Sequence, residues 1–368
     1  MGLQGEEQRV DVSAIKGRGA ATRSPHRFEH RARDPFDDGW SAFNEATHTK
    51  VALAAPATTV SWEDAKSAIS HNDSPDIYFA YGLNPYRGCE HGCSYCYARP
   101  THSYLGLSPG LDFETRIIAK RNIAQVLRAE LGRASYVPQQ IALGTVTDCY
   151  QPIERELQLT RAVLQVLSET HHPFGLVTKG SGVERDLDLI VPMAERKLAA
   201  VYVTLTTLDA ALARKLEPRA AAPHRRLRTI RALAAQGVPV GVSVGPHIPF
   251  VNDDMEQVLE AAWEAGARSA FYTVLRLPWE LNGIFQQWLQ LHYPQRAERT
   301  MARIREMRGG KDYDANFATR MKGSGVWAEL IAQRFCKASA RLGFNRERVE
   351  LDVGQFRHAL ARGQSVLF

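Results

Sequence analysis

The stretch Arg87-Gly-Cys-Glu-His-Gly-Cys-Ser-Tyr-Cys-Tyr-Ala-Arg99 contains three of the chain's five cysteines, Cys89, Cys93 and Cys96. Their spacings of four and three residues place three thiols on one short loop. Three thiolates can hold three corners of a cubane iron–sulfur cluster and leave the fourth iron without a protein ligand. An open metal position is typical of catalytic sites, whereas a fully ligated metal is structural. The loop therefore predicts a reactive metal centre.

Two glycines directly precede the first two cysteines, at Gly88 and Gly92. A chain that bends sharply around a cluster needs residues that accept positive φ, as glycine does without strain. The alternative is a zinc knuckle in which His91 or His102 supplies the fourth ligand. A further alternative is that the three thiols are unrelated. If the loop does bind a metal, the protein could also be a non-catalytic zinc or iron–sulfur protein, for example a redox sensor.

Six short apolar runs in the chain have the composition of buried strands. Each is rich in Val, Ile, Leu, Thr or Tyr and carries almost no charge, as expected for parallel strands covered on both faces. The segments between them show helical spacing with charged outer faces, and such alternation indicates βα units around a parallel sheet. The expected strands are residues 77–83, 140–147, 174–178, 200–206, 238–244 and 269–275, and the expected helices are residues 122–131, 154–170, 184–197, 226–236 and 254–265.

Two features mark the ends of the expected helices. Asp253 or Asp254 is placed to cap the N-terminus of the last helix, and Gly237 and Gly266 are placed to end two helices. Because the cysteine loop follows the first strand, it should lie at the C-terminal mouth of a barrel, where barrels of this kind place their chemistry.

The C-x3-C-x2-C spacing, with the aromatic Tyr95 just before the third cysteine, resembles that of the radical S-adenosylmethionine (SAM) enzymes. The resemblance implies an α/β fold, an incomplete (β/α)6 TIM-like barrel. It also implies a [4Fe–4S] cluster on Cys89, Cys93 and Cys96, with SAM chelated by the fourth iron. An electron from a donor such as flavodoxin or ferredoxin would then cleave SAM to a 5′-deoxyadenosyl radical.

Residues 84–278 are further similar to the spore photoproduct lyase-like branch of that superfamily, which is often labelled DNA repair photolyase-like. This finer resemblance implies lyase-like radical chemistry on an unidentified substrate, with nucleic acid as one candidate. It is carried by Asn84-Pro-Tyr-Arg-Gly-Cys89, Thr145-Val-Thr-Asp-Cys-Tyr-Gln-Pro-Ile-Glu154, Thr178-Lys-Gly180 and Arg185-Asp186.

The resemblance assigns cofactor contacts to four further residues: Tyr95, Thr147, Lys179 and Thr204. Tyr95 matches an aromatic residue that shields the cluster and borders adenine, and the other three match positions that contact SAM. A lysine beside a bound carboxylate would make a charge-assisted contact. The alternative for Lys179 is a surface lysine at the end of a helix. The alternative for Thr147 and Thr204 is that they are ordinary β-branched strand residues.

One departure from the branch concerns hydrogen-atom return. Where spore photoproduct lyase has a cysteine near the end of the second strand, this chain has Thr145, whose hydroxyl is a poor hydrogen-atom donor. Cys149, four residues on, is the candidate catalytic residue for that role, although a lone cysteine is most often a small buried hydrophobe. We expect Cys336 to lie in the core.

Residues 8–33 form a basic N-terminal segment with seven cations and two carboxylates, which supplies most of the chain's net charge of +6. Such a segment indicates an arm rather than part of the core. It could follow a phosphate backbone, remain a solvated tail, or pair with acidic groups of its own barrel. The cations are Arg9, Lys16, Arg18, Arg23, Arg27, Arg31 and Arg33.

These patterns predict three regions: an N-terminal arm and extension (1–74), a core barrel (75–300) and a C-terminal helical region (301–368). Residues 325–342 have a long helical pattern that could close the barrel's open side. The sequence shows neither a basic start followed by an apolar run nor an apolar stretch of about 18 residues. We therefore expect a cytoplasmic protein with no membrane partner.

Overall fold

The computed structural model describes residues 13–29 and 56–358. Within them the main element is a seven-stranded sheet in the order β10-β9-β8-β7-β6-β3-β2. All neighbours in it are parallel except β2 and β3, which pair antiparallel. Six parallel strands in chain order, with helices between them, confirm the α/β class and are consistent with a partial TIM-like barrel. The strands are β2 (Ile69–His71), β3 (Tyr81–Leu83), β6 (Ile141–Leu143), β7 (Phe174–Thr178), β8 (Ala199–Thr204), β9 (Val240–Ser243) and β10 (Ser269–Phe271).

Each of the six expected strands is present, although most are shorter than the apolar runs. The run at 77–83 begins late because its first residues belong to the turn from β2 to β3, where Asn72 N–H donates to Ala80 O at 2.8 Å. At the other end of the sheet the last run forms a strand only over Ser269–Phe271. Apolar composition therefore marked which segments enter the sheet but overestimated how far each one pairs.

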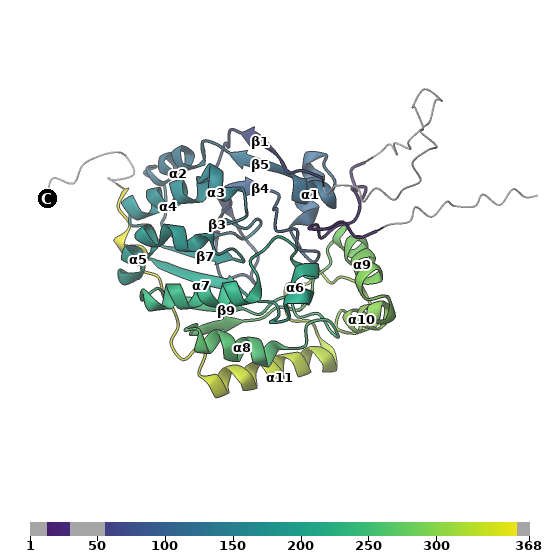
Figure 1. Cartoon of the computed structure of the whole chain (residues 1–368). Helices are drawn as coiled ribbons and strands as arrows, with labels where there is room; N and C mark the ends of the chain where they lie inside the picture. Colours follow the sequence, from purple (N-terminus) through teal and green to yellow (C-terminus); the bar gives the residue numbers. More distant parts are fainter. Residues whose placement is uncertain (1–12, 30–55, 359–368) are drawn as a thin grey trace, which may run out of the picture.

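Helices α2 (Ile123–Leu131), α4 (Leu159–Glu169), α5 (Leu187–Glu195), α7 (Pro223–Ala235) and α8 (Met255–Glu264) pack along one side of this sheet (Figure 1). The helix expected at 154–170 is broken, with α3 (Glu154–Leu157) preceding α4 and Gln158 at φ 53° between them. The Glu154 carboxylate accepts the Thr160 N–H at 3.0 Å and so satisfies the start of α4.

Both predicted glycine stops are confirmed, because Gly237 and Gly266 have φ of 74° and 110°. Asp254 does precede α8, but its side chain makes no capping bond. Its carboxylate instead accepts the Thr207 hydroxyl at 2.9 Å and the Leu208 N–H at 2.7 Å.

A second, three-stranded sheet lies beside the first, in the order β1-β5-β4. Its strands are β1 (Thr59–Glu63), β4 (Tyr86–Arg87) and β5 (Arg116–Lys120), and α1 (Leu111–Thr115) leads into β5. Strand β4 runs directly into Gly88 and the cysteine loop. This small sheet therefore fixes the point at which the loop begins.

The C-terminal region contributes α9 (Leu281–His292), α10 (Pro294–Glu306) and α11 (Gly325–Leu342). Helix α11 matches the expected 325–342 and lies along α8 (Figure 1). Its buried face contains Ala328, Ile331, Phe335 and Ala338, which recur at helical spacing. Cys336 falls between these positions and is exposed, so the expectation that it belongs to the core was wrong.

An ion pair connects the segment before α11 to the turn between β2 and β3. Arg320, just before α11, binds Asp76 from the β2–β3 turn with both N···O distances at 2.6 Å. Both side chains are only 12% exposed. Among the described helices, none is both long and apolar enough to span a bilayer.

Candidate active site

The cysteine loop follows β4 and turns twice on glycine. Gly88 and Gly92 have φ of 80° and 65°, which confirms the expected left-handed conformations. Cys89 and Cys93 are buried and Cys96 is half-buried. Cys89 N–H donates to Phe113 O at 2.9 Å, which ties the loop to α1.

Arg99 lies at the start of the 3-10 helix η1 (Arg99–Leu105) and is completely buried beneath the loop. Its guanidinium donates to Cys93 O at 2.9 Å and to Gly92 O at 3.0 Å. The charge is balanced by Glu114, 2.5 Å away and equally buried. A planar guanidinium with several donors can bind several carbonyls at once, so this pair fixes the path of the loop backbone.

The segment after β6 docks on the same loop. Gln151 accepts the Glu90 N–H at 2.9 Å and donates to Gly88 O at 3.2 Å. In return the Glu90 carboxylate accepts the Ile153 N–H at 2.7 Å. These reciprocal bonds give Gln151 and Glu90 a positioning role that sequence reasoning did not foresee.

Asp148 connects the loop to the end of β7. Its carboxylate lies 3.3 Å from His91 Nδ1 and accepts the Thr178 hydroxyl at 2.7 Å and the Lys179 N–H at 2.6 Å. Burial alone would raise the pKa of Asp148, but His91 and these hydrogen bonds hold it well below its ordinary value. The ionised carboxylate thereby sets where Lys179 leaves its strand.

Lys179 reaches toward the loop, with its ammonium 5.8 Å from the centre of the Tyr95 ring. Burial opposes its charge, but Cys93, Glu217 and Asp148 more than offset that, so the pKa of Lys179 is raised. The ammonium is therefore retained at neutral pH beside the cysteine loop. This placement differs from that of a surface lysine at the end of a helix.

A buried polar cluster lies behind Tyr95, formed by Tyr95, Thr206, Glu217 and Arg226. The Tyr95 and Thr206 hydroxyls and the Arg226 guanidinium all donate to the Glu217 carboxylate. Arg226 also donates to Thr204 O at 3.0 Å and to Ala221 O at 2.7 Å. The cluster therefore locks the ring of Tyr95 against the end of β8.

Glu217 remains ionised in this cluster. Burial would raise the pKa of Glu217, but Arg226 and Lys179 lower it to about 2. Sequence reasoning missed Glu217 and Arg226 because each stands among other charged residues, a pattern typical of exposed segments. Arg226 and Lys179 thus lie on either side of the ionised Glu217 carboxylate, and Asp148 is a second carboxylate near Lys179.

The two threonines of the predicted cofactor contacts are both buried. The Thr147 hydroxyl donates to Tyr86 O at 3.4 Å, and its N–H donates to the Asn84 side chain at 3.2 Å. Thr204 ends β8, where its carbonyl is held by Arg226. Thr204 therefore ends a strand as expected, whereas Thr147 lies in the irregular segment after β6, which ends at Leu143.

The histidines of the zinc alternative have other partners. His91 faces Asp148, and His102 Nε2 lies 3.1 Å from Arg116 O. Across residues 13–29 and 56–358, no three His, Cys, Asp or Glu side chains are gathered as a single metal ion requires. A zinc ion collects its ligands around one point, whereas a cubane cluster spreads its thiolates over separate irons.

Comparison with known proteins agrees with this geometry. Residues 83–262 match the family model of the radical SAM superfamily. The chain contains a radical SAM domain. That domain begins at the last residue of β3 and includes the cysteine loop and the strands from β4 to β9.

Its curated relatives carry no assigned function. The chain is 38% identical over 224 residues to uncharacterized proteins of Mycobacterium bovis and Mycobacterium tuberculosis. The match covers 60% of this chain and 66% of theirs, slightly less than two thirds of their length. An uncharacterized protein of Methanocaldococcus jannaschii is 25% identical over 220 residues, which cover 59% of this chain and 78% of that protein.

Among solved structures, the radical SAM domain resembles spore photoproduct lyase. A complex of that enzyme with dinucleoside spore photoproduct has a TM-score of 0.51 and 15% identity, covering 78% of this chain and 81% of that one. A mutant with bound AdoMet and the same dinucleoside has a TM-score of 0.51 and 14% identity, with the same coverage. At this identity the likeness shows a shared fold.

The residues of the loop fit the iron–sulfur cluster that a radical SAM domain implies. Burial raises the pKa of Cys93 to about 12, despite the opposing charge of Lys179. Burial likewise raises the pKa of Cys89, and Cys93 and Cys96 add to this effect, so the three thiols lie within electrostatic range of one another. Because metal binding requires thiolates, loading this site would release protons.

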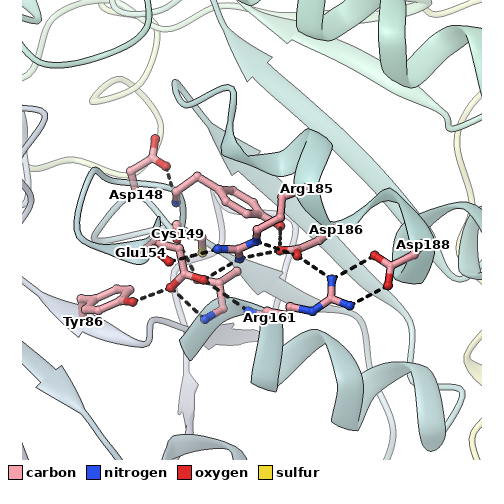
Figure 2. A network of polar contacts seen from close by, with 10 residues as sticks. Tyr86, Asp148, Cys149, Glu154, Arg161, Arg185, Asp186 and Asp188 are labelled. Atoms are coloured by element: carbon pink, nitrogen blue, oxygen red, sulfur yellow. Dashed lines mark hydrogen bonds and ion pairs between the residues drawn. The ribbon is translucent and has the colours of Figure 1, made fainter. Parts of the chain in front are cut away.

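A second network, shown in Figure 2, accounts for the Arg185–Asp186 motif of the radical SAM domain. Arg185 binds the Glu154 carboxylate at 2.8 Å, and Glu154 accepts the Tyr86 hydroxyl. Arg161 joins Asp186 at 2.9 Å to Asp188. Arg185 and Asp186, at the end of η2 (Gly182–Asp186), thus hold the segment after β6 in place. Through Glu154 this network also reaches Tyr86, which lies three residues before Cys89. The motif therefore has a structural role.

Cys149 lies within the main hydrophobic core and is completely buried. Its carbonyl accepts the Thr160 hydroxyl at 2.7 Å, and burial raises the pKa of its thiol. This environment is typical of a packing residue. Thr145 is half-buried, and its hydroxyl accepts Asn84 Nδ2–H at 3.3 Å.

Proposed function

We propose that the protein is a radical SAM enzyme in which Cys89, Cys93 and Cys96 ligate a [4Fe–4S] cluster. When bound, the reduced cluster and SAM supply a 5′-deoxyadenosyl radical that abstracts hydrogen from the substrate. The observation that carries this proposal is the set of three thiols on a loop held rigidly by Arg99, with Lys179 beside Cys93. Cys96 is the least buried of the three, so the loop is accessible from its side.

The protein's own residues divide the work of binding the cofactor. Lys179 supplies a cation for the carboxylate of SAM, and Tyr95, held by Glu217, supplies a fixed aromatic surface next to Cys96. Thr204 stands at the end of β8 and Thr147 in the segment after β6, where their hydroxyls can serve the amino acid part of SAM. A charge-assisted contact of this kind is among the stronger polar interactions.

Substituting Lys179 with Ala should weaken SAM binding by about 1.5–3 kcal/mol, because one charge-assisted hydrogen bond is lost. The cluster should still assemble, because Lys179 is not on the cysteine loop. Anaerobic titration with SAM gives the dissociation constant, and Lys66→Ala, which removes an exposed lysine, is the matched control. Equal affinities for the two variants would contradict the assignment of Lys179.

Turnover distinguishes this proposal from the alternatives. After anaerobic purification and reduction with dithionite, the protein should contain iron and sulfide and should convert SAM to 5′-deoxyadenosine. A stable cluster without SAM cleavage would instead indicate a non-catalytic iron–sulfur protein or redox sensor. Zinc in place of iron and sulfide would support the zinc alternative.

The class of substrate is a separate question, and nucleic acid is supported by the fold and by the spore photoproduct lyase-like motifs. The basic arm adds little support, because its described arginines have partners in the chain. Arg18 donates to Glu114 O at 3.2 Å, while Arg23 pairs with Asp112 at 3.1 Å and Arg27 with Glu280 at 2.8 Å. Arg9, Arg31 and Arg33 lie outside the described residues. Pairing with the protein's own acidic groups is the alternative that the described part of the arm favours.

A further inference from the structure

Residues 13–29 precede the radical SAM domain by more than 50 residues, yet they pack against the cysteine loop. In Figure 1 this segment, coloured dark purple, lies near α1 and α9. Its central part, residues 15–20, is called the strap here. Strap residues Arg18, Gly19 and Ala20 are buried, which is unexpected for a basic arm.

Glu114 binds the strap through its carboxylate. Gly19 N–H donates to Oε2 at 3.0 Å and Ala20 N–H donates to Oε1 at 2.8 Å. The same carboxylate pairs with Arg99, which holds the carbonyls of Gly92 and Cys93. One side chain, that of Glu114, therefore connects the strap to the guanidinium that positions the cysteine loop.

The strap also touches the loop directly, at Gly19. A Cβ atom at Gly19 would lie 1.7 Å from Gly92 O and 3.1 Å from Ser94 N, so no larger residue fits. A Cβ at Gly92 would in turn lie 2.5 Å from the Glu114 carboxylate. Strap, loop and carboxylate thus meet at van der Waals distance, on the backbone between Cys89 and Cys96.

Apolar contacts hold the strap in place independently of the loop. Ile15 and Ala20 pack with Leu111 of α1 and with Ile284 of α9. A segment that served only to add stability could bind anywhere along α9. Gly19 instead packs directly on the backbone of the loop.

We propose that the strap is a positioning element of the cluster site, which holds residues 92–94 in place and covers them from solvent. This rests on the proposed function, in which Cys89, Cys93 and Cys96 ligate the cluster. Weakening the strap should leave the barrel folded but make the cysteine loop more mobile. A bound cluster would then be lost more readily.

The test compares two identical substitutions in the full-length protein. Gly19→Ala places a methyl group where Gly92 O lies, whereas Gly283→Ala adds the same group to an exposed glycine of α9 with open space around it. After anaerobic reconstitution, the rate of iron loss to a chelator is measured, together with the EPR spectrum of the reduced cluster and the Tm. For Gly19→Ala we expect iron loss to accelerate about tenfold, the factor that corresponds to one or two lost hydrogen bonds, with an altered EPR spectrum.

Gly283→Ala should match the wild-type protein in iron loss and EPR spectrum, with a Tm equal to or slightly above the wild-type value because alanine favours a helix more than glycine does. If Gly19→Ala does not fold, Ile15→Ala loosens the strap without touching the loop and should accelerate iron loss with the Tm nearly unchanged. Wild-type rates and spectra in the variant that folds would overturn the proposal for the strap alone. Absence of an iron–sulfur cluster from the wild-type protein would instead overturn the proposed function.

Discussion

Replacing Cys93 with Ala is expected to abolish the iron–sulfur cluster, and Cys89→Ala and Cys96→Ala should do the same. A cluster held at three points has no spare protein ligand, because the fourth iron is the one left open for SAM. Iron and sulfide content and the EPR spectrum after anaerobic reconstitution measure the effect. SAM cleavage should disappear with the cluster.

The chain provides two matched controls for this experiment. Cys336→Ala changes an exposed thiol and should alter neither iron content nor stability. Cys149→Ala changes a fully buried thiol and should lower stability while leaving iron content nearly unchanged. Full cluster occupancy in the Cys93→Ala protein would contradict the ligand assignment. Loss of iron from Cys149→Ala would contradict the assignment of Cys149 as a packing residue.

The second large effect is expected at Glu217. Glu217→Ala should destabilise the protein by about 3–5 kcal/mol, because it leaves the buried Arg226 guanidinium without its counter-charge. Chemical unfolding under anaerobic conditions gives the free energy of unfolding. The control is Asp64→Ala, which breaks an exposed pair with Arg121 and should change stability little. A similar small change for Glu217→Ala would show that Arg226 does not depend on it.

The same carboxylate predicts a pH dependence. Despite its burial, the pKa of Glu217 is lowered from 4.5 to about 2 by Arg226 and Lys179. A depressed pKa stabilises the fold above the unfolded value, so this contribution is complete above about pH 4.5 and is lost as pH falls toward 2. Glu217→Gln keeps the shape without the charge. The stability difference between wild-type protein and Glu217→Gln should therefore shrink over that range.

Sequence reasoning succeeded where the signal is local. The apolar composition of the buried strands predicted where they lie. The need for tight turns around the cysteines predicted the left-handed conformations of Gly88 and Gly92. It failed where a residue's role depends on partners far away in the chain. Gly19 meets Glu114 across 95 residues and Tyr95 meets Glu217 across 122, and nothing within either segment indicates the other.

The misplacement of Cys336 has a different origin. Cys336 has apolar neighbours in the sequence. The buried face of the helix, however, contains Ile331 and Phe335, and Cys336, the next residue, points away from that face. An average over neighbouring residues cannot resolve a rotation of about 100° per residue, whereas periodicity can. The helical periodicity predicted the correct bounds of α11, whereas the burial of Cys336 was predicted only from its neighbours in the sequence.

The contacts of Arg99 bear on how the cofactor could be replaced after damage. The guanidinium, Gln151 and Glu114 hold the cysteine loop entirely through protein groups, so its shape is set when the polypeptide folds. A zinc finger, by contrast, unfolds when its metal leaves. For the cluster proposed here, we therefore expect that loss on oxidation leaves the backbone of the cysteine loop in place. We expect that iron and sulfide could then rebuild the proposed cluster on the folded protein, without unfolding of the chain.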